Sequence, residues 1–249
     1  MQTSNHLRPF SERSRGARWR LHLAYGIVGL FFRLTSRLHI AGAEHISEDD
    51  VVLASNHISL LDTLLIPYSI MTIQGVQFIS APAKAELFRL PIFGRAIASL
   101  GAFPVRRGRG DLRAIRRIEE HMRTGKLMLF PEGTRSLDGC LGKGKRMVGK
   151  LIYDTRPVVV PAAIWGTNQV WPSVRRLFRC RPSIGIRYGQ PLDLQQYYTR
   201  PDTKETAEAI VREVMGAIAM LLEPDESSVT SVSRRHGPSR EIPNGSTGV

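Results

Sequence analysis

Cysteine, aromatic residues and long apolar runs are all scarce in this chain of 249 residues. Its two cysteines, Cys140 and Cys180, form no Cys-x-x-Cys pair, which argues against a disulfide framework and indicates free thiols in a reducing compartment. Aromatic residues make up 7% of the sequence, and we find no RNA-binding aromatic motif, zinc-finger spacing or basic heptad array. Nucleic acid is therefore the least favoured of the anionic partners, and we expect none.

Positive charge is the compositional feature that stands out. The chain has 35 Lys and Arg against 22 Asp and Glu, a formal net charge of +13. Such a balance attracts an acidic membrane surface, a phosphorylated ligand or nucleic acid. Hydrophobic residues make up 42%, enough for a substantial core, and the length suits one large domain.

The N-terminal apolar run, Leu23 to Phe32, is about half as long as a membrane-spanning helix requires. A cleaved signal peptide fits poorly, because Arg33 and Arg37 lie between this run and the small residues Ala41-Gly42-Ala43. The segment from Trp19 to Leu38 instead predicts an amphipathic helix. Its apolar residues recur at steps of three or four: Trp19, Leu23, Ile27, Leu30, Leu34 and Leu38. We interpret it as lying in a membrane interface, with a core-packed helix as the alternative.

Short strands and helices alternate along the rest of the chain. The strands are expected near residues 51–55, 76–80, 101–105, 127–130, 157–164 and 183–188. This alternation predicts an α/β fold with a mixed, largely parallel sheet flanked by helices, preceded by the amphipathic segment. We divide the chain into a basic N-terminal segment (1–44), an α/β domain (45–223) and a disordered tail (224–249) rich in Ser, Pro, Gly and Arg.

A histidine and a carboxylate follow the expected strand at residues 51–55. His57 and Asp62 are five residues apart, about 500° around a helix, so they can pair only if His57 precedes the helix and Asp62 lies in its first turn. The spacing from Ser59 to Asp62 reads as a capping box that starts the helix there. We expect this helix to stop near Pro67. The pair can carry acid–base chemistry, although Asp62 as a simple cap and His57 as a loop residue remain the alternative.

Two further polar clusters follow expected strands. Arg106 and Arg107 come after residues 101–105, and the segment Glu132 to Arg135 comes after residues 127–130. A guanidinium group offers a planar fork to phosphate oxygens, and a glycine lets backbone amides approach an anion closely. Because loops at strand ends carry the sites of parallel sheets, we expect the three clusters to share one edge. A solvated basic turn is the alternative for the arginines.

In this order, the clusters resemble the first three motifs of the glycerolipid acyltransferase family. They read Asn56-His57-x-Ser59-x-x-Asp62, Phe103-Pro104-Val105-x-Arg107 and Phe130-Pro131-Glu132-Gly133-Thr134-Arg135-Ser136, and Val159-Val160-Pro161-Ala162-Ala163-Ile164 resembles the fourth. The resemblance covers residues 45–190 and points to the 1-acylglycerol-3-phosphate (lysophosphatidic acid) O-acyltransferases. It implies transfer of an acyl group from acyl-CoA or acyl-acyl carrier protein to lysophosphatidic acid, giving phosphatidic acid.

The same resemblance implies roles for individual residues. His57 would be the catalytic base and Asp62 its partner. The residues implied to hold the acceptor are Arg107, Glu132, Gly133, Thr134 and Arg135. We expect the reaction to need no metal and no other cofactor. Two positions depart from the family pattern: Arg106, and the segment Gly144-Lys145-Arg146-Met147.

Several alternatives stay open beside this expectation. The acceptor could be another lysolipid or a polyol phosphate, or the chain could be a non-catalytic peripheral module that binds anionic lipid. Its basic groups would suit either. The expected location is the cytoplasmic face of the cell membrane, in a peripheral or monotopic position.

Overall fold

The computed structural model describes residues 14–47, 50–106, 112–170 and 181–223. In these segments seven strands form one sheet in the order β1-β7-β6-β2-β5-β3-β4. Their bounds are β1 (Arg37–Ala41), β2 (Val51–Ser55), β3 (Ile79–Lys84), β4 (Ala102–Val105), β5 (Lys126–Leu129), β6 (Val159–Trp165) and β7 (Ser183–Tyr188). Neighbouring strands are parallel except β6 and β7, which are antiparallel. The predicted mixed, largely parallel α/β fold is confirmed.

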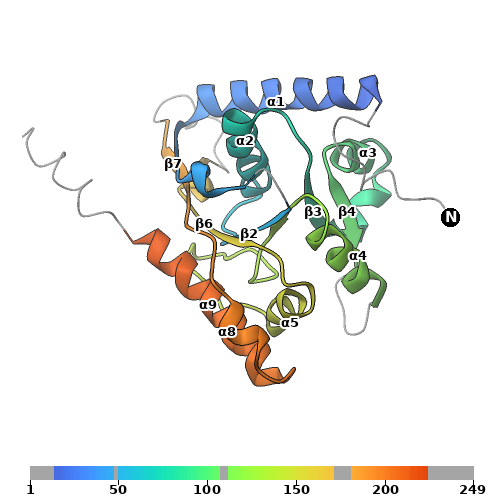
Figure 1. Ribbon diagram of the computed structural model, residues 1–249. Coiled ribbons are helices and arrows are strands. Elements are labelled where there is room, and N and C mark those ends of the chain that lie inside the picture. The colour runs from blue at the N-terminus through green and yellow to red at the C-terminus, as the bar shows by residue number, and fades with distance from the viewer. Residues whose placement is uncertain (1–13, 48–49, 107–111, 171–180, 224–249) are drawn as a thin grey trace, which may run out of the picture.

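Helices cover both faces of the sheet (Figure 1). The α-helices are α1 (Arg15–Thr35), α2 (Asp62–Gln74), α3 (Pro91–Ser99), α4 (Leu112–Met122), α5 (Arg146–Thr155), α6 (Thr167–Val170), α8 (Gln195–Tyr198) and α9 (Lys204–Leu222). Two 3-10 helices, η2 (Ala43–His45) and η3 (Ala85–Arg89), complete the set in the described part of the chain. One core cluster packs α1 and α2 against the sheet, and the other packs α4, α5 and α9 against the opposite face.

The helix α2 continues through Pro67 to Gln74, so the prediction that it stops near this proline was wrong. A proline inside a helix costs about 3 kcal/mol, because a hydrogen bond is lost and its ring crowds the preceding turn. The residues Ile66, Ile70 and Met71 are buried along α2. Burial of each such side chain contributes about 1.5–3 kcal/mol, and together they outweigh the proline.

The N-terminal helix ends three residues before its predicted end. Ser36 closes α1, because its backbone N–H and its hydroxyl both donate to the carbonyl of Phe32. Leu38 then belongs to β1, which pairs in parallel with β7 along its whole length. The helical spacing that includes Leu38 therefore continues into a strand, and the sheet begins at Arg37.

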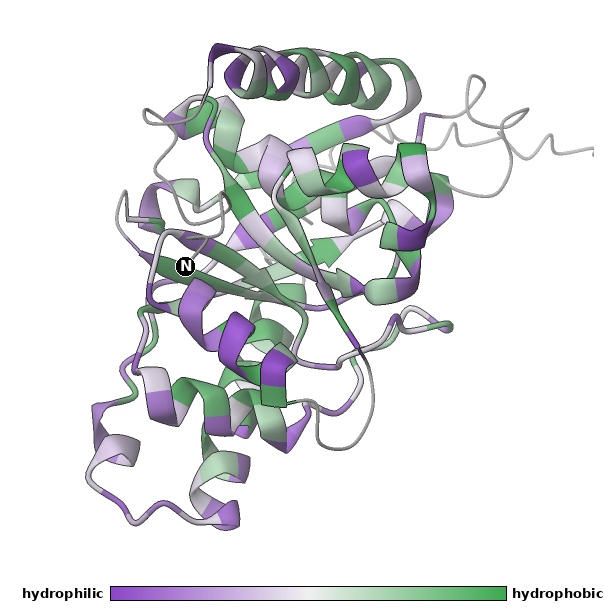
Figure 2. Ribbon diagram, turned by 90° about the vertical axis from the view of Figure 1, so that its right-hand side faces the viewer, coloured by the Kyte–Doolittle hydropathy of each residue, from purple (hydrophilic) through white to green (hydrophobic). Residues whose placement is uncertain are grey.

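The helix α1 has two apolar faces. Leu21 and Phe32 are buried, and the ring of Tyr25 stacks on Tyr68 of α2 at 5.2 Å between centroids. The residues of the predicted stripe lie on the solvent side: Trp19, Leu23, Ile27, Leu30 and Leu34. Figure 2 shows apolar residues recurring along α1 after its hydrophilic first turns. The core-packed helix and the exposed apolar stripe are thus both present, on different faces.

None of the helices that the structure describes is long and apolar enough to cross a bilayer.

Most other elements lie near their predicted positions, and β7 matches residue for residue. The strand β3 lies a few residues later than predicted, at Ile79–Lys84 instead of 76–80. The predicted tail (224–249) and the first 13 residues lie outside the described residues.

Candidate active site

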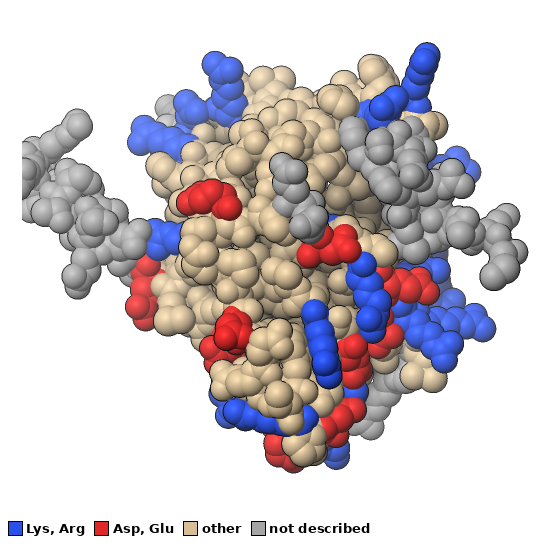
Figure 3. All heavy atoms as spheres, in the orientation of Figure 1, with Lys and Arg blue, Asp and Glu red and all other residues tan. Residues whose placement is uncertain are grey.

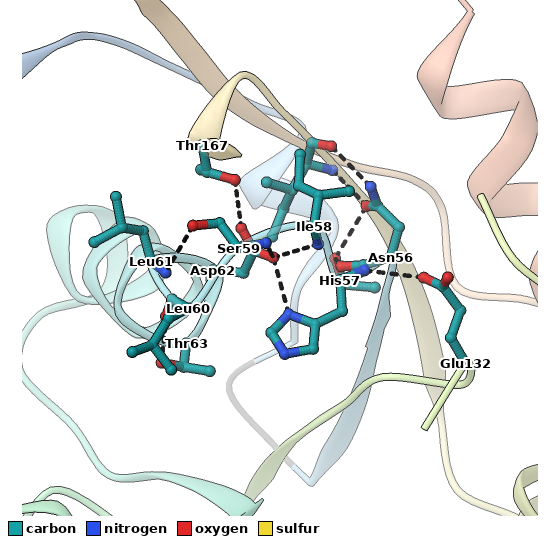
Figure 4. Close-up of polar contacts among 12 residues, drawn as sticks. Asn56, His57, Ile58, Ser59, Leu60, Leu61, Asp62, Thr63, Glu132 and Thr167 are labelled. Carbon is teal, nitrogen blue, oxygen red and sulfur yellow. Dashed lines mark hydrogen bonds and ion pairs between the residues drawn. The ribbon is translucent and has the colours of Figure 1, made fainter. Parts of the chain in front are cut away.

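Three adjacent strands in the middle of the sheet carry the site at their carboxyl ends. β2 leads into His57, β5 leads into Glu132, and β6 leads into Thr167. Because β5 and β6 both run parallel to β2, the residues that follow all three strands meet at one edge (Figure 4). This is where parallel sheets place their ligands and catalytic groups.

Asn56 fixes the point at which the chain leaves β2. Its side-chain amide donates to the carbonyl of Ile164 at 2.8 Å and accepts from the N–H of the same residue at 2.7 Å. The side chain therefore continues the hydrogen-bonded ladder between β2 and β6 by one more rung. Asn56 is buried, so removal of either bond would leave a backbone group of β6 without its partner in an apolar interior.

His57 and Asp62 form the predicted pair. The imidazole Nδ1 lies 2.9 Å from Asp62 Oδ2, and Asp62 is the first residue of α2, while His57 precedes the helix. His57 is 8% exposed and Asp62 is fully buried. The same carboxylate oxygen accepts the N–H groups of Ile58 and Ser59 at 2.7 and 2.8 Å, so it acts as an acceptor throughout. His57 Nδ1 therefore donates to the carboxylate, and Nε2 is the ring nitrogen left to face a ligand.

The predicted capping box is only half formed. Asp62 accepts from the Ser59 N–H, as a box requires. The Ser59 hydroxyl, however, accepts from Leu61 N–H at 3.3 Å instead of from Asp62. The carboxylate is thus shared between two backbone amides and the imidazole, which combines both readings of Asp62: it caps the turn and it pairs with His57.

Thr167 is a site residue that the sequence reading missed. Its hydroxyl donates to Asp62 Oδ1 at 2.5 Å, and the residue is fully buried at the start of α6. The bond holds the carboxylate oxygen that does not face the imidazole, so it sets the rotation of the carboxylate. A threonine directly after a strand was the only available signal, and the sequence did not show that this strand lies beside β2.

Phe130 holds the imidazole from one side. Its ring stacks on His57 with centroids 3.9 Å apart and planes 14° from parallel. The phenyl ring also lines an apolar cavity of about 170 Å³ that extends between α1, α2, α3 and the strands β3 to β5. The lining includes Leu64, Tyr68, Met71, Phe93 and Ile97. The cavity therefore begins beside the histidine and leads away from it through apolar side chains.

Glu132 is buried beside the histidine and bonds to two backbone N–H groups. It is 4% exposed, and its two carboxylate oxygens accept the backbone N–H groups of His57 at 3.0 Å and Gly142 at 2.9 Å. A β-carbon at Gly142 would lie 2.7 Å from Glu132 Oε2, so the loop approaches as closely as glycine allows. With both oxygens used in this way, Glu132 ties two loops together, and its role in holding the acceptor stays a prediction.

The turn after Glu132 is exposed. Gly133 has a φ of 69°, a conformation that favours glycine, and Thr134 and Arg135 are both exposed to solvent. Ser136 N–H donates to the carbonyl of His57 at 2.7 Å, so this turn is anchored at the histidine. Its hydroxyl donates to Asp138, and this bond together with the Cys140 N–H lowers the pKa of that carboxyl group.

The second predicted cluster lies farther away. Arg107 lies outside the described residues, and Arg106 follows β4, three strands from β2. At about 4.8 Å between neighbouring strands, this separates the two strands by roughly 14 Å. The clusters thus share one edge of the sheet, as expected, but they stand at different places along it.

Residues 37–165 match the family model described as "Acyltransferase". The chain belongs to the acyltransferase family. It is 33% identical over 143 residues to the chloroplastic 1-acyl-sn-glycerol-3-phosphate acyltransferase of Arabidopsis thaliana, a match that covers 55% of this chain and 38% of that protein. The 1-acyl-sn-glycerol-3-phosphate acyltransferase of Pseudomonas aeruginosa is 30% identical over 141 residues. This match covers 55% of this chain and 52% of that protein.

A solved member of the family has the same architecture. The crystal structure of the 1-acyl-sn-glycerophosphate (LPA) acyltransferase PlsC from Thermotoga maritima superimposes with a TM-score of 0.61 and 25% identity, over 86% of each chain. The match with the Arabidopsis thaliana relative, in contrast, spans about two fifths of that protein. Membership of the acyltransferase family therefore rests on the shared domain.

Proposed function

We propose that the protein transfers a fatty acyl group from a thioester donor to the free hydroxyl of lysophosphatidic acid, giving phosphatidic acid. The observation that carries this proposal is the buried pair of His57 and Asp62, with Nδ1 and Oδ2 2.9 Å apart. A peripheral module that only binds anionic lipid has no need of such a pair. The name of the acceptor in the relatives supports the choice of lysophosphatidic acid.

In the proposed reaction His57 is the general base. Its Nε2 accepts the proton of the lysolipid hydroxyl as that oxygen attacks the thioester carbonyl carbon. The tetrahedral intermediate collapses, the carbon–sulfur bond breaks, and the departing thiolate takes the proton back from Nε2. Asp62 stabilises the imidazolium that exists between these two transfers. General-base assistance of this kind contributes a factor of about 10²–10⁴.

The acyl chain and the phosphate are assigned to different parts of the site. The apolar cavity that begins at Phe130 suits the fatty acyl chain, because its lining is almost entirely hydrocarbon. The exposed Arg135, next to the residue that bonds His57, suits the acceptor phosphate. We assign Arg107 to the same phosphate, and we assign Gly133 and Thr134 to the glycerol part. The donor is a thioester of coenzyme A or of acyl carrier protein.

We further propose that α1 holds the protein on an anionic membrane surface, at the cytoplasmic leaflet. Its exposed apolar stripe is accompanied by arginines such as Arg15, Arg20 and Arg33. Apolar side chains can enter the interface while arginines meet anionic headgroups, each adding about 1 kcal/mol near the surface. This arrangement brings the enzyme to an acceptor that itself resides in the bilayer.

The test is release of free thiol from acyl-CoA or acyl-acyl carrier protein in the presence of lysophosphatidic acid, measured with the full-length chain. His57→Ala should lower kcat by about 10²–10⁴ with an unchanged circular dichroism spectrum. His39→Ala is the matched control, because His39 is an exposed histidine on the edge strand β1. Activity of His57→Ala close to that of the wild type would contradict the mechanism. A panel of other lysolipids and polyol phosphates identifies the acceptor.

A further inference from the structure

A second exposed apolar surface lies at the corner between η3 and α3. We define this corner as residues 90–93, Leu90-Pro91-Ile92-Phe93, all four of which are exposed. The Ile92 side chain is 85% exposed, more than any large apolar residue of α1. Four consecutive exposed apolar residues are unusual on a soluble surface and mark a contact site.

The corner is held in place by its backbone. Pro91 occupies the first position of α3, where its missing N–H costs nothing, and Gly94 N–H donates to the carbonyl of Leu90 at 2.7 Å. A β-carbon at Gly94 would lie 2.7 Å from Phe88 Cα, so the turn is closed as tightly as glycine permits. The exposed side chains are therefore presented by a well-packed turn.

The corner stands beside α1 (Figure 1). The apolar cavity lies between these two elements: Leu21 and Tyr25 of α1 line it together with Phe93 and Ile97 of α3. A fatty chain that enters between α1 and α3 would reach Phe130, and with it the imidazole of His57. A surface that delivers the fatty chain would therefore have to contact both α1 and α3.

The charges around the corner are basic. Arg89 directly precedes it and Arg95 follows it, and both are exposed. In Figure 3 the charged side chains at the upper edge, where α1 lies, are Lys and Arg, whereas acidic side chains gather lower on the molecule. Apolar residues bordered by arginines fit a bilayer with anionic headgroups better than a protein surface of mixed charge.

We propose that the Leu90–Phe93 corner is a second contact with an anionic phospholipid bilayer, and that α1 and this corner together set the cavity against the lipid. Lipid chains then enter the cavity sideways between α1 and α3. The identity of the entering lipid rests on the proposed function, whereas the membrane contact does not depend on it.

The first experiment compares Ile92→Asp with Met220→Asp in the full chain. Met220 is an exposed apolar residue of α9, on the other side of the sheet, and makes the matched control. Binding is measured by co-sedimentation with vesicles of phosphatidylcholine and phosphatidylglycerol. Ile92→Asp should weaken binding by about tenfold, the lower end of what burial of an isoleucine contributes, while Met220→Asp should bind like the wild type. Both variants should keep the wild-type melting temperature.

Three results would overturn the proposal. The first is Ile92→Asp binding as tightly as the wild type. The second is an equal loss in Met220→Asp. The third is a change in oligomeric state for Ile92→Asp with vesicle binding intact, which would assign the corner to a second copy of the chain.

A spin label gives a measurement that is independent of any loss of binding. It is attached to Ile92→Cys or Met220→Cys after replacement of the two native cysteines by serine. On vesicles, the label at position 92 should be accessible to oxygen and protected from a water-soluble nickel chelate, and the label at position 220 should show the reverse. A label at 92 that stays accessible to the chelate contradicts the proposal.

An activity measurement separates this proposal from the proposed function. On a short-chain, monodisperse acceptor, Ile92→Asp should transfer acyl groups at the wild-type rate, while transfer to acceptor in vesicles falls with binding. If the wild type transfers no acyl group at all but the label at 92 still enters the bilayer, the enzyme assignment fails and the membrane contact stands. Equal loss of activity on both acceptors would contradict sideways entry.

Discussion

The carboxylates Asp62 and Glu132 are buried and fully hydrogen-bonded. In contrast, the turn from Gly133 to Arg135, which directly follows Glu132, is exposed. The two regions share the same edge of the sheet, and Ser136 joins them through its bond to the His57 carbonyl. The buried region fixes the imidazole before any ligand arrives, which reduces reorganisation during the reaction. The exposed region leaves a cation available to an anionic ligand. Substitutions in the first should therefore change kcat, and those in the second should change KM.

The largest effect is expected from Asp62→Asn. An amide cannot stabilise the imidazolium, and its NH₂ group faces donors, so kcat should fall about a thousandfold, within the range for loss of general-base catalysis. The buried donors left without an acceptor should lower the free energy of unfolding by about 1–3 kcal/mol. Steady-state kinetics with a thiol reagent and denaturant unfolding measure the two quantities. A kcat within threefold of the wild type, roughly 0.7 kcal/mol, would remove Asp62 from the mechanism.

Arg135→Ala tests the exposed region. Loss of a charge-assisted hydrogen bond to phosphate of about 1.5–3 kcal/mol should raise KM for lysophosphatidic acid roughly 10- to 100-fold with kcat almost unchanged. Stability should stay within about 0.5 kcal/mol, because Arg135 is exposed. Arg212→Ala, an exposed arginine on α9, is the control and should leave KM unchanged. A fall in kcat with constant KM would move Arg135 from binding to catalysis.

Glu132→Gln tests whether this buried carboxylate positions His57 or binds the acceptor. Glutamine can accept only one of the two backbone N–H groups that the carboxylate now holds, so we expect a loss of about 1–3 kcal/mol in unfolding free energy. The His57 backbone should shift, and kcat should fall about tenfold, or roughly 1.4 kcal/mol, with little change in KM. Glu120→Gln, an exposed glutamate of α4, serves as the control. A KM effect alone, with wild-type stability, would instead return Glu132 to substrate binding.

The smallest effect is expected from Thr167→Val, which keeps the shape and removes the hydroxyl that bonds Asp62. We expect kcat to fall about fivefold, on the order of 1 kcal/mol of transition-state stabilisation, because the carboxylate can rotate away from the imidazole. Thr167→Ser should restore most of the rate, since it restores the donor. If the valine and serine variants are equally slow, packing of the methyl group, and not the hydrogen bond, accounts for the effect.

Local spacing showed how the central pair could form, and the family resemblance favoured that pairing over a simple cap. His57 and Asp62 are five residues apart, and the end of a strand followed by the start of a helix leaves few ways to arrange them. The same local logic failed at Pro67 and Leu38. In both cases the prediction followed a rule about single residues or periodicity, while burial along α2 and strand pairing with β7 decided the outcome.

The exposed apolar stripe of α1 shows a different limit of prediction from periodicity. The periodicity holds from Trp19 to Leu34, but it could not show which side faces solvent. The helix carries a second set of apolar residues, including Leu21 and Phe32, and these are the ones that pack on the core. An amphipathic pattern gives the spacing of a face, and the rest of the fold chooses which face is covered.

By itself, the sequence determined the excess of basic charge and indicated the alternation of strands and helices. It also restricted how His57 and Asp62 could pair, because that geometry depends on residues close together in the chain. Only the tertiary structure brought Thr167 and Glu132, 105 and 75 residues beyond their partners, to the two sides of that pair. These contacts form because β5 and β6 are the two neighbours of β2 in the sheet. Strand order is set by packing of the whole domain, so no single segment encodes it.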